Sequence, residues 1–151
     1  MNHATETLIV GAGPFGLGLA AYLQKRQHDF RMVGYPMEFW KRHMPAGMLL
    51  RSGIEWHLDP DNQWTIERFL SERGTSRGLV EPLSRELYLS YCEWFMRRAE
   101  IPVQETYVTQ LGQNGNHFQA TLADGSSVRA RQVVIATGFY STPTFRPGYR
   151  N

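Results

Sequence analysis

Three glycines near the N-terminus have the spacing of a phosphate-binding turn. Gly11, Gly13 and Gly16 form a G-x-G-x-x-G pattern directly after the apolar run Leu8–Val10. In this pattern the first glycine permits a tight turn, the second lets the backbone approach a pyrophosphate, and the third lets a helix pack close to the strand. A helix that starts here also points its free N–H groups at the phosphate. The spacing therefore predicts nucleotide binding, against the alternative of a glycine-rich turn in an unrelated α/β protein.

The residues around this turn read as strand, helix and strand. The apolar run indicates a strand over residues 5–10 that is buried in a parallel sheet. A helix is expected from about Pro14 to Gln27, because a proline is tolerated in the first turn, where its missing N–H has no partner. A second strand is expected over residues 30–33.

In many dinucleotide-binding folds an acidic residue ends the second strand and binds the ribose hydroxyls. This chain reads Val33-Gly34-Tyr35-Pro36 at that place, without a carboxylate. Glu38 follows a few residues later and could reach back, but its spacing differs from the usual one. The ribose contact is therefore unassigned.

The stretch from Glu38 to Ser52 is too rich in aromatic residues and methionine for an ordinary surface loop. Trp40 and Met48 could stack on a flat aromatic ligand, and Arg51 and Ser52 could make polar contacts with it. The alternative is a short helix and an extended piece that pack on the core. The residues alone favour neither interpretation.

The middle of the chain predicts two helices. Thr65 is a suitable N-cap for the first, and Ser84 begins a longer second one that runs to about Glu100. Residues 74–78, between the helices, read as a flexible connector. Cys92 falls in the middle of the longer helix without a positive neighbour in sequence, so we interpret it as a packed hydrophobe rather than a nucleophile.

The last third of the chain alternates between apolar and polar residues. Residues 103–110 indicate one strand, or two joined by a bend, and residues 117–122 and 127–131 indicate two more. Asn114-Gly115 and Asp124-Gly125 are typical hairpin turns, so these strands predict an antiparallel meander.

The sequence predicts a second buried apolar strand over residues 132–135, which then runs into Ala136-Thr137-Gly138. We expect this strand and the first one to end at the same carboxyl edge of a parallel sheet, where α/β folds bind their ligands. The predicted fold class is thus α/β, a Rossmann-like parallel sheet with a small antiparallel β-meander.

Composition bounds the class of protein. The net charge of +2, without a polybasic run, argues against nucleic acid or an anionic membrane as partner. No apolar segment is long enough to span a bilayer or to serve as a signal peptide, and the single Cys92 fits a reducing cytoplasm. The lone cysteine also excludes a flavin disulfide reductase, which needs two cysteines close together. The five histidines lack metal-ligand spacing, so no metal site is expected.

The glycine turn, the meander and residues 133–138 together resemble the FAD-binding half of the two-dinucleotide-domain flavoproteins, whose second signature is Ala-Thr-Gly after an apolar strand. Within that superfamily the middle region is similar to the class B flavin-dependent monooxygenases. The similarity is greatest to the N-hydroxylating branch and to FAD-dependent urate hydroxylase-like proteins. The residues that carry this finer similarity are Trp40, Gly47-Met48, Asp59-Pro60, Thr65, Pro82-Leu83-Ser84-Arg85, Tyr91 and Trp94.

The resemblance implies FAD as cofactor, NADPH as electron donor and oxygen transfer from a peroxyflavin to a small-molecule substrate. It implies no acid, base or nucleophile from the protein, since the cofactor carries the chemistry. The residues that it places at the cofactor are Gly11, Gly13, Pro14, Phe15 and Gly16 at the pyrophosphate, Trp40, Met48, Arg51 and Ser52 near the ring system, Val108 at the adenine, and Ala136, Thr137 and Gly138 over the cofactor.

Enzymes of this kind run to several hundred residues and contain a second dinucleotide domain for NADPH, whereas this chain has one G-x-G-x-x-G in 151 residues. We therefore expect residues 1–151 to form a single FAD-binding domain, truncated relative to such enzymes and without the NADPH-binding domain. One alternative is a non-catalytic dinucleotide-binding fragment. A small NAD(P)-dependent dehydrogenase is a further alternative, which the missing Tyr-x-x-x-Lys pair disfavours.

Overall fold

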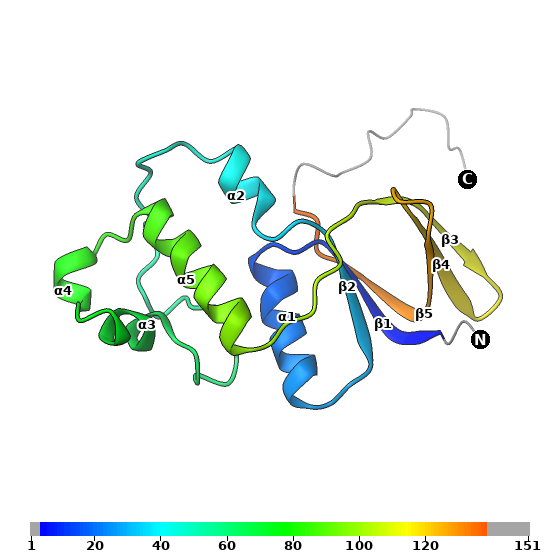
Figure 1. Cartoon of the computed structure of the whole chain (residues 1–151), viewed down its shortest axis with the longest axis horizontal. Coiled ribbons are helices and arrows are strands. Elements are labelled where there is room, and N and C mark those ends of the chain that lie inside the picture. The colour runs from blue at the N-terminus through cyan, green and yellow to red at the C-terminus, as the bar shows by residue number, and fades with distance from the viewer. Residues whose placement is uncertain (1–3, 139–151) are drawn as a thin grey trace, which may run out of the picture.

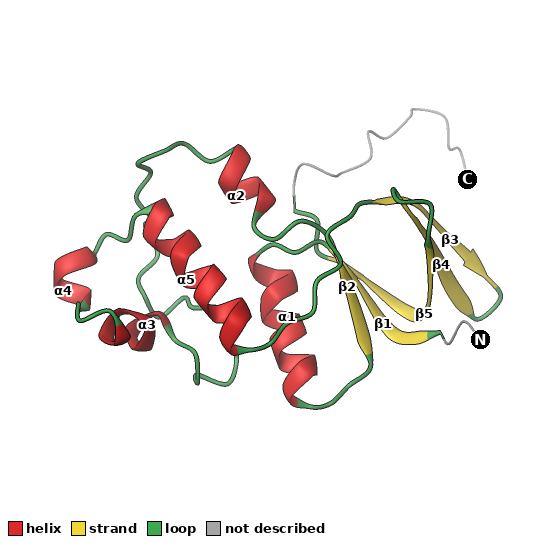
Figure 2. Ribbon diagram, in the orientation of Figure 1, coloured by secondary structure: helices red, strands yellow, loops and turns green. Residues whose placement is uncertain are grey.

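The computed structural model describes residues 4–138 as an α/β fold, with the helices gathered on one side and the strands on the other (Figure 1). Figure 2 shows the same division by type of secondary structure. In chain order the elements are β1 (Thr5–Val10), α1 (Pro14–Lys25), β2 (Phe30–Val33), α2 (Glu38–Arg42), α3 (Ile66–Glu72), α4 (Arg77–Val80), α5 (Arg85–Arg98), β3 (Val108–Asn114), β4 (His117–Leu122) and β5 (Ser127–Ile135).

The strands form one sheet in the order β2-β1-β5-β4-β3. β1 is parallel to both of its neighbours, with Leu8 opposite Arg31 of β2 and Val133 of β5. β5, β4 and β3 then follow as antiparallel neighbours. The predicted fold class, a parallel sheet joined to an antiparallel meander, is confirmed.

β5 joins the two parts of the sheet as one continuous strand, where the sequence pattern predicts two. Residues 127–130 pair with β4, and residues 130–135 pair with β1. Val134 and Ile135 are 37% and 60% exposed, so the expected burial of this apolar run is wrong for these two residues. The described elements leave their side chains uncovered.

The segment that starts at Val103 is two pieces joined by a bend, one of the two expected forms. Gln104 makes an isolated parallel bridge with Val33 of β2, donating its N–H to Met32 O at 2.9 Å and accepting from Gly34 N–H at 3.1 Å. The regular strand β3 begins only at Val108. The first piece therefore extends the parallel part of the sheet, and the second belongs to the meander.

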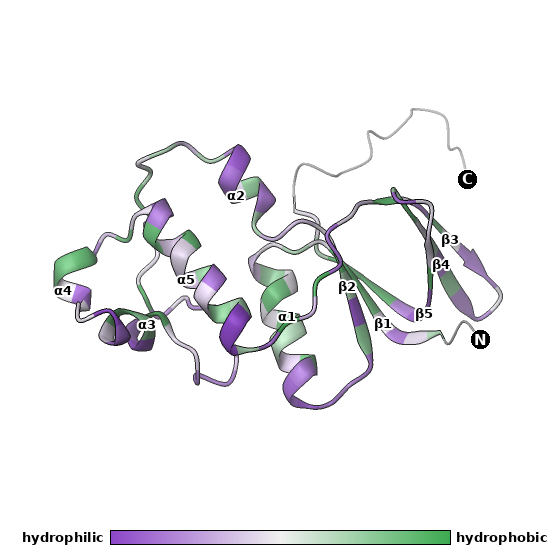
Figure 3. Cartoon of the chain, in the orientation of Figure 1, coloured by the Kyte–Doolittle hydropathy of each residue, from purple (hydrophilic) through white to green (hydrophobic). Residues whose placement is uncertain are grey.

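Two apolar cores form because adjacent residues of a strand point to opposite faces of the sheet. Ile9 belongs to the larger core, which α1, α3 and α5 complete with residues such as Leu17, Phe69 and Phe95. Leu8 belongs to the smaller core, which β4 and β5 complete. In Figure 3 α1 is mostly hydrophobic, whereas the outer strand β3 carries a hydrophilic stretch.

Both predicted N-caps are confirmed. Thr65 Oγ1 accepts the N–H of Arg68 at 3.1 Å, and Ser84 Oγ accepts the N–H of Leu87 at 3.2 Å. Such caps contribute about 1 kcal/mol each, because they satisfy first-turn N–H groups. They fix where α3 and α5 begin.

The prediction of a flexible connector over residues 74–78 is wrong at its C-terminal end, where α4 begins at Arg77. Arg77 Nε donates to Glu81 Oε2 at 2.6 Å, one helical turn away. Glu81 also accepts the N–H of Ile54 at 3.1 Å. Through Glu81, α4 is thus attached to the loop around Ile54, which precedes α3.

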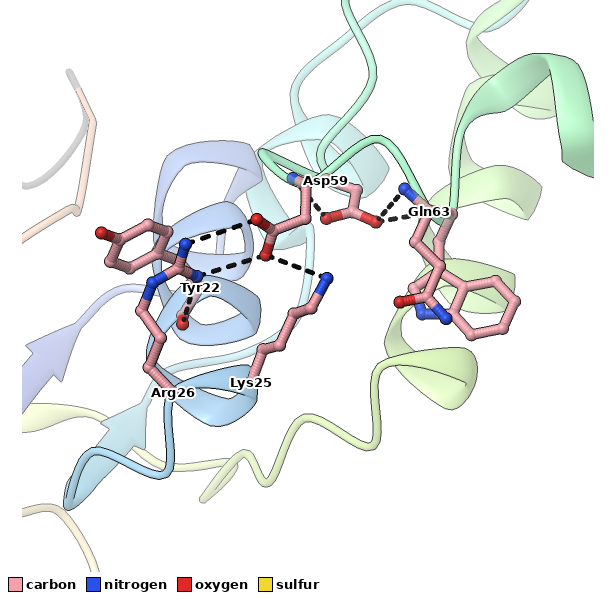
Figure 4. Close-up of polar contacts among 7 residues, drawn as sticks. Tyr22, Lys25, Arg26, Asp59 and Gln63 are labelled. Atoms are coloured by element: carbon pink, nitrogen blue, oxygen red, sulfur yellow. Dashed lines mark hydrogen bonds and ion pairs between the residues drawn. The ribbon is translucent and has the colours of Figure 1, made fainter.

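The loop before α3 is organised by a buried carboxylate (Figure 4). Asp59 is 6% exposed and accepts the backbone N–H groups of Asp61, Gln63 and Trp64 at 3.0, 2.9 and 2.7 Å. From α5, Tyr91 accepts the N–H of Leu58 and donates to Trp64 O, both at 2.9 Å. The loop therefore has internal and tertiary partners for its buried backbone groups.

The same loop is attached to α1 through Asp61. Its carboxylate pairs with Arg26 at 3.2 Å and with Lys25 at 3.5 Å, at the end of α1 (Figure 4). The Arg26 guanidinium also lies over the Tyr22 ring, 3.5 Å from its centroid. This contact joins the helical part of the molecule to the strand-helix-strand unit.

Candidate functional site

The carboxyl ends of β1, β2 and β5 meet at the glycine turn. Gly11 N–H donates to Val33 O of β2 at 2.8 Å. Ala136 N–H, just after β5, donates to Val10 O at 2.7 Å. The two glycine-bearing strand ends thus meet at one edge of the sheet, as the sequence predicts, and the structure shows in addition that their strands are neighbours.

The three glycines of the turn have different surroundings. Gly11 has φ +111°, and a Cβ there would lie 2.6 Å from the carbonyl carbon of Ala136 and collide with its oxygen. A Cβ on Gly16 would collide with the carbonyl oxygen of Gly11, so α1 packs close to the turn. No heavy atom lies within 4 Å of a Cβ added to Gly13. Packing therefore requires glycine at Gly11 and Gly16, whereas open space surrounds Gly13.

The N-terminus of α1 suits an anion. Its N-cap is Gly13, which has no side chain to accept the first-turn N–H groups, and the first turn holds no acidic residue. Pro14 stands at the first helical position. Phe15 is 90% exposed, and its backbone N–H belongs to the same first turn. The positive end of the helix dipole is therefore not neutralised by the helix's own first-turn side chains.

Ala136 and Thr137 lie against this turn. Thr137 N is 2.9 Å from the Cβ position of Gly11. Gly138 has φ +69° and is the last described residue. The three residues predicted to close over a cofactor thus begin beside the predicted phosphate turn.

Val108 opens β3 and is half-buried. The residue before it, Tyr107, packs its ring on Tyr35, with 4.8 Å between the ring centroids. Tyr35 follows the end of β2, so the segment predicted to meet adenine lies beside the end of that strand.

Trp40 packs against the larger core. It is half-buried on α2, and its ring centroid lies 4.9 Å from that of Tyr88 on α5. Burial raises the pKa of Tyr88 far above its usual value. The packing interpretation of Trp40 therefore describes these contacts, and the residue as a whole is half-buried.

Met48 is held by backbone pairing with the start of α5. Its carbonyl accepts the N–H of Arg85 at 2.8 Å, next to an antiparallel bridge between Leu49 and Ser84. The Arg85 guanidinium donates to Met44 O, and Glu86 accepts the N–H of Gly47 at 3.3 Å. Arg51 and Ser52 follow this paired stretch and are exposed. The ring contact of Trp40 and the backbone contact of Met48 thus both run to α5.

A polar cluster near the end of β2 was not predicted from the sequence. Tyr107 donates its hydroxyl to Glu38 Oε1 at 2.5 Å, and Arg42 pairs with the same oxygen at 3.0 Å. Glu38 raises the pKa of Tyr107 by accepting this hydrogen bond. Glu38 and Arg42 are one helical turn apart on α2, a spacing visible in the sequence, whereas Tyr107 lies 69 residues further along the chain, so no local pattern could have added it to the cluster.

Cys92 is fully buried in α5, as predicted for a packed hydrophobe. Burial raises the pKa of its thiol to about 12. Over residues 4–138, no group of three potential metal-ligating side chains comes together. No helix in that range is long and apolar enough to cross a membrane.

A parallel sheet whose glycine turn leads into the N-terminus of a helix defines a Rossmann-like, dinucleotide-binding class of α/β fold. The family described as pyridine nucleotide-disulphide oxidoreductase matches residues 8–148. The chain belongs to this family.

Known proteins of two kinds are similar to the chain. A thioredoxin reductase from Gibberella zeae is 27% identical over 139 residues, which make up 91% of this chain and 36% of that protein. A flavin-containing monooxygenase from Stenotrophomonas maltophilia has the same fold over 91% of this chain and 39% of its own, with 22% identity and a TM-score of 0.73. A bacillithiol disulfide reductase from Staphylococcus aureus matches over the same shares, with 24% identity and a TM-score of 0.71.

The chain thus spans little more than a third of the length of these relatives. The exclusion of a disulfide reductase from the single Cys92 is wrong at the level of the family, since the matching family is described as pyridine nucleotide-disulphide oxidoreductase. The cysteine count of this chain concerns only the part of such a protein that it spans.

Proposed function

We propose that this chain is the FAD-binding part of an NADPH-dependent flavoprotein monooxygenase. The observation that carries the proposal is the glycine turn, which opens at Gly13 onto the uncapped N-terminus of α1 and which the ends of β2 and β5 enclose. A pyrophosphate fits such a turn because free N–H groups and the helix dipole both attract negative charge. Pro14, Phe15 and Gly16 would complete this cradle.

The rest of the cofactor would extend to both sides of the turn. On the ring side, the half-buried Trp40 and Met48 would provide apolar contact, and the exposed Arg51 and Ser52 polar contact. FAD would supply the redox chemistry and the activation of oxygen. The chain would bind it, orient it and keep water from its ring. Val108 would contact the cofactor on the adenine side. The residues over the cofactor would be Ala136, Thr137 and Gly138.

Monooxygenation is favoured by the resemblance of the stretch between Glu38 and Ser52 to the class B flavin-dependent monooxygenases. A disulfide reductase is the second candidate, favoured by the family match and by the similar thioredoxin reductase. It would need a cysteine pair other than the buried Cys92. A non-catalytic dinucleotide-binding fragment is the third.

Titration of the purified chain with FAD tests the binding proposal. We expect a yellow protein that releases flavin on heating. Gly13→Ala should keep the fold, because its Cβ meets no heavy atom within 4 Å and its φ of −81° suits alanine, yet it should bind FAD at least about tenfold more weakly. Gly112→Ala on β3, which also has open space, is the matched control. Absence of flavin from the wild-type chain after FAD is added would overturn the proposal.

The reaction is tested by NADPH oxidation with the chain alone and with the protein encoded by its complete reading frame. A monooxygenase consumes oxygen and places one of its atoms in a small-molecule product, whereas a reductase consumes NADPH only when a disulfide is supplied. Robust NADPH-dependent oxygen consumption by the 151-residue chain would exclude the fragment interpretation.

A further inference from the structure

We infer that Glu38 binds the ribose hydroxyls of the adenosine half of the dinucleotide, an inference that rests on the FAD binding proposed above. The structure links this carboxylate to the phosphate turn on one side and to the adenine segment on the other. In FAD the ribose of the adenosine half likewise stands between pyrophosphate and adenine.

The first link runs through Met37. This residue has a left-handed backbone, with φ 55°, and donates its N–H to Ala12 O inside the glycine turn at 2.9 Å. Glu38 N–H then donates to Tyr35 O at 3.2 Å. The chain after β2 therefore folds back onto the turn, and Glu38 stands one residue from that contact. Glu38 lies further along the sequence than the usual acidic residue, and this turn brings it back towards the glycine turn.

The second link runs through Tyr107, which precedes the proposed adenine contact Val108. The Tyr107 hydroxyl donates to Glu38 Oε1 at 2.5 Å. Its ring packs on Tyr35, which adds an apolar contact beside the carboxylate. The side chain of Glu38 is therefore oriented by a residue of the adenine segment itself.

Gly34 explains why the acid has moved. Gly34 occupies the place at the end of β2 where the acid usually stands. Its φ is +146°, and a Cβ there would lie 3.0 Å from Ala12 N. A side chain at this position would be strained and would press on the phosphate turn. Gly34 lets the end of β2 approach the glycine turn closely, so an acidic residue that binds the ribose has to come later in the chain.

The carboxylate of Glu38 retains capacity to accept hydrogen bonds from hydroxyls. It is 22% exposed, and its contacts with Tyr107 and Arg42 both use Oε1. A carboxylate accepts about four hydrogen bonds. Two ribose hydroxyls match this acceptor, because they are neutral donors and hydrogen bonds to a charged group are the stronger kind.

The decisive experiment measures binding of ADP and of 2′,3′-dideoxy-ADP to the wild-type chain and two variants by calorimetry. We expect the wild type to prefer ADP by about tenfold to a hundredfold. Glu38→Gln should lower ADP affinity by a similar factor and bring the ratio of the two affinities close to one. Glu105→Gln, a matched change of an exposed acid on the neighbouring segment, should leave the ratio at the wild-type value.

A Glu38→Gln variant that keeps the wild-type ratio overturns the inference, even if its stability falls, because a structural role in α2 would alter stability without altering the ratio. Tyr107→Phe, which removes only the hydroxyl that orients Glu38, should reduce the ratio partially and serves if Glu38→Gln does not fold. A wild type that binds FAD but shows no preference for ADP overturns the inference alone. A wild type that binds neither nucleotide overturns the proposed function together with it.

Discussion

The carbonyl group of Ala136 occupies the space that a Cβ on Gly11 would need. The two residues are 125 positions apart, yet the Ala136 N–H group bonds to Val10 O, directly before the turn. The segment that starts at Ala136, after β5, thus packs directly against the glycine turn that follows β1. Gly11 is required both for its φ of +111° and for this approach of β5.

Gly11→Ala should therefore unfold or strongly destabilise the chain. A loss of about 3 kcal/mol or more is expected, because backbone strain and a clash with an immobile carbonyl add together. Urea denaturation followed by circular dichroism measures it. Gly13→Ala, with open space around its Cβ, should unfold close to the wild-type midpoint. Equal stability of the Gly11 variant would contradict the packing of β5 on the turn.

Asp59→Asn should destabilise the helical part of the molecule. The two carboxylate oxygens of Asp59 accept three backbone N–H groups, whereas Asn offers only one acceptor oxygen. At least one part-buried N–H group therefore loses its partner, at a cost of about 1–3 kcal/mol. Asp124→Asn is the control, since Asp124 accepts similar bonds from Ser126 in an exposed hairpin. If both variants lose the same stability, burial of the Asp59 carboxylate is not the cause.

Asp61 predicts a pH dependence of stability. The hydrogen bond from Arg26 lowers the pKa of the Asp61 carboxyl below its usual range. A carboxyl whose pKa is lower in the folded state stabilises the fold above its unfolded pKa of about 4, and this contribution is lost as the pH falls through the lowered value. The urea midpoints of wild type and Asp61→Asn should therefore differ near neutral pH and converge in acid. A constant difference at every pH would contradict the ion pair.

Cys92 should resist thiol reagents in the folded chain. It is fully buried, and burial raises the pKa of its thiol to about 12, so little reactive thiolate forms near neutral pH. Ellman's reagent should label it slowly in buffer and rapidly in urea. Rapid labelling of the native chain would show that α5 opens or that Cys92 is accessible.

Local patterns in the sequence were sufficient to predict the elements that depend on residues close together in the chain. β1 and β2 have the predicted bounds, and Thr65 and Ser84 are the N-caps expected of their residue types. These features depend on apolar runs, glycine spacing and side-chain oxygens next to helix starts, all of which act over a few residues. The order of the two signatures also indicated the fold class correctly.

Contacts between distant segments decided the rest. The sequence by itself determined the glycine turn, the strand-helix-strand unit and the meander. Only the tertiary structure showed that β5 is one strand shared by both parts of the sheet, that the contacts of Trp40 run to Tyr88, and that Met37 brings Glu38 back to the turn. The physical reason is range, because a residue's type sets its local conformation, whereas its neighbours in space depend on how the whole chain packs.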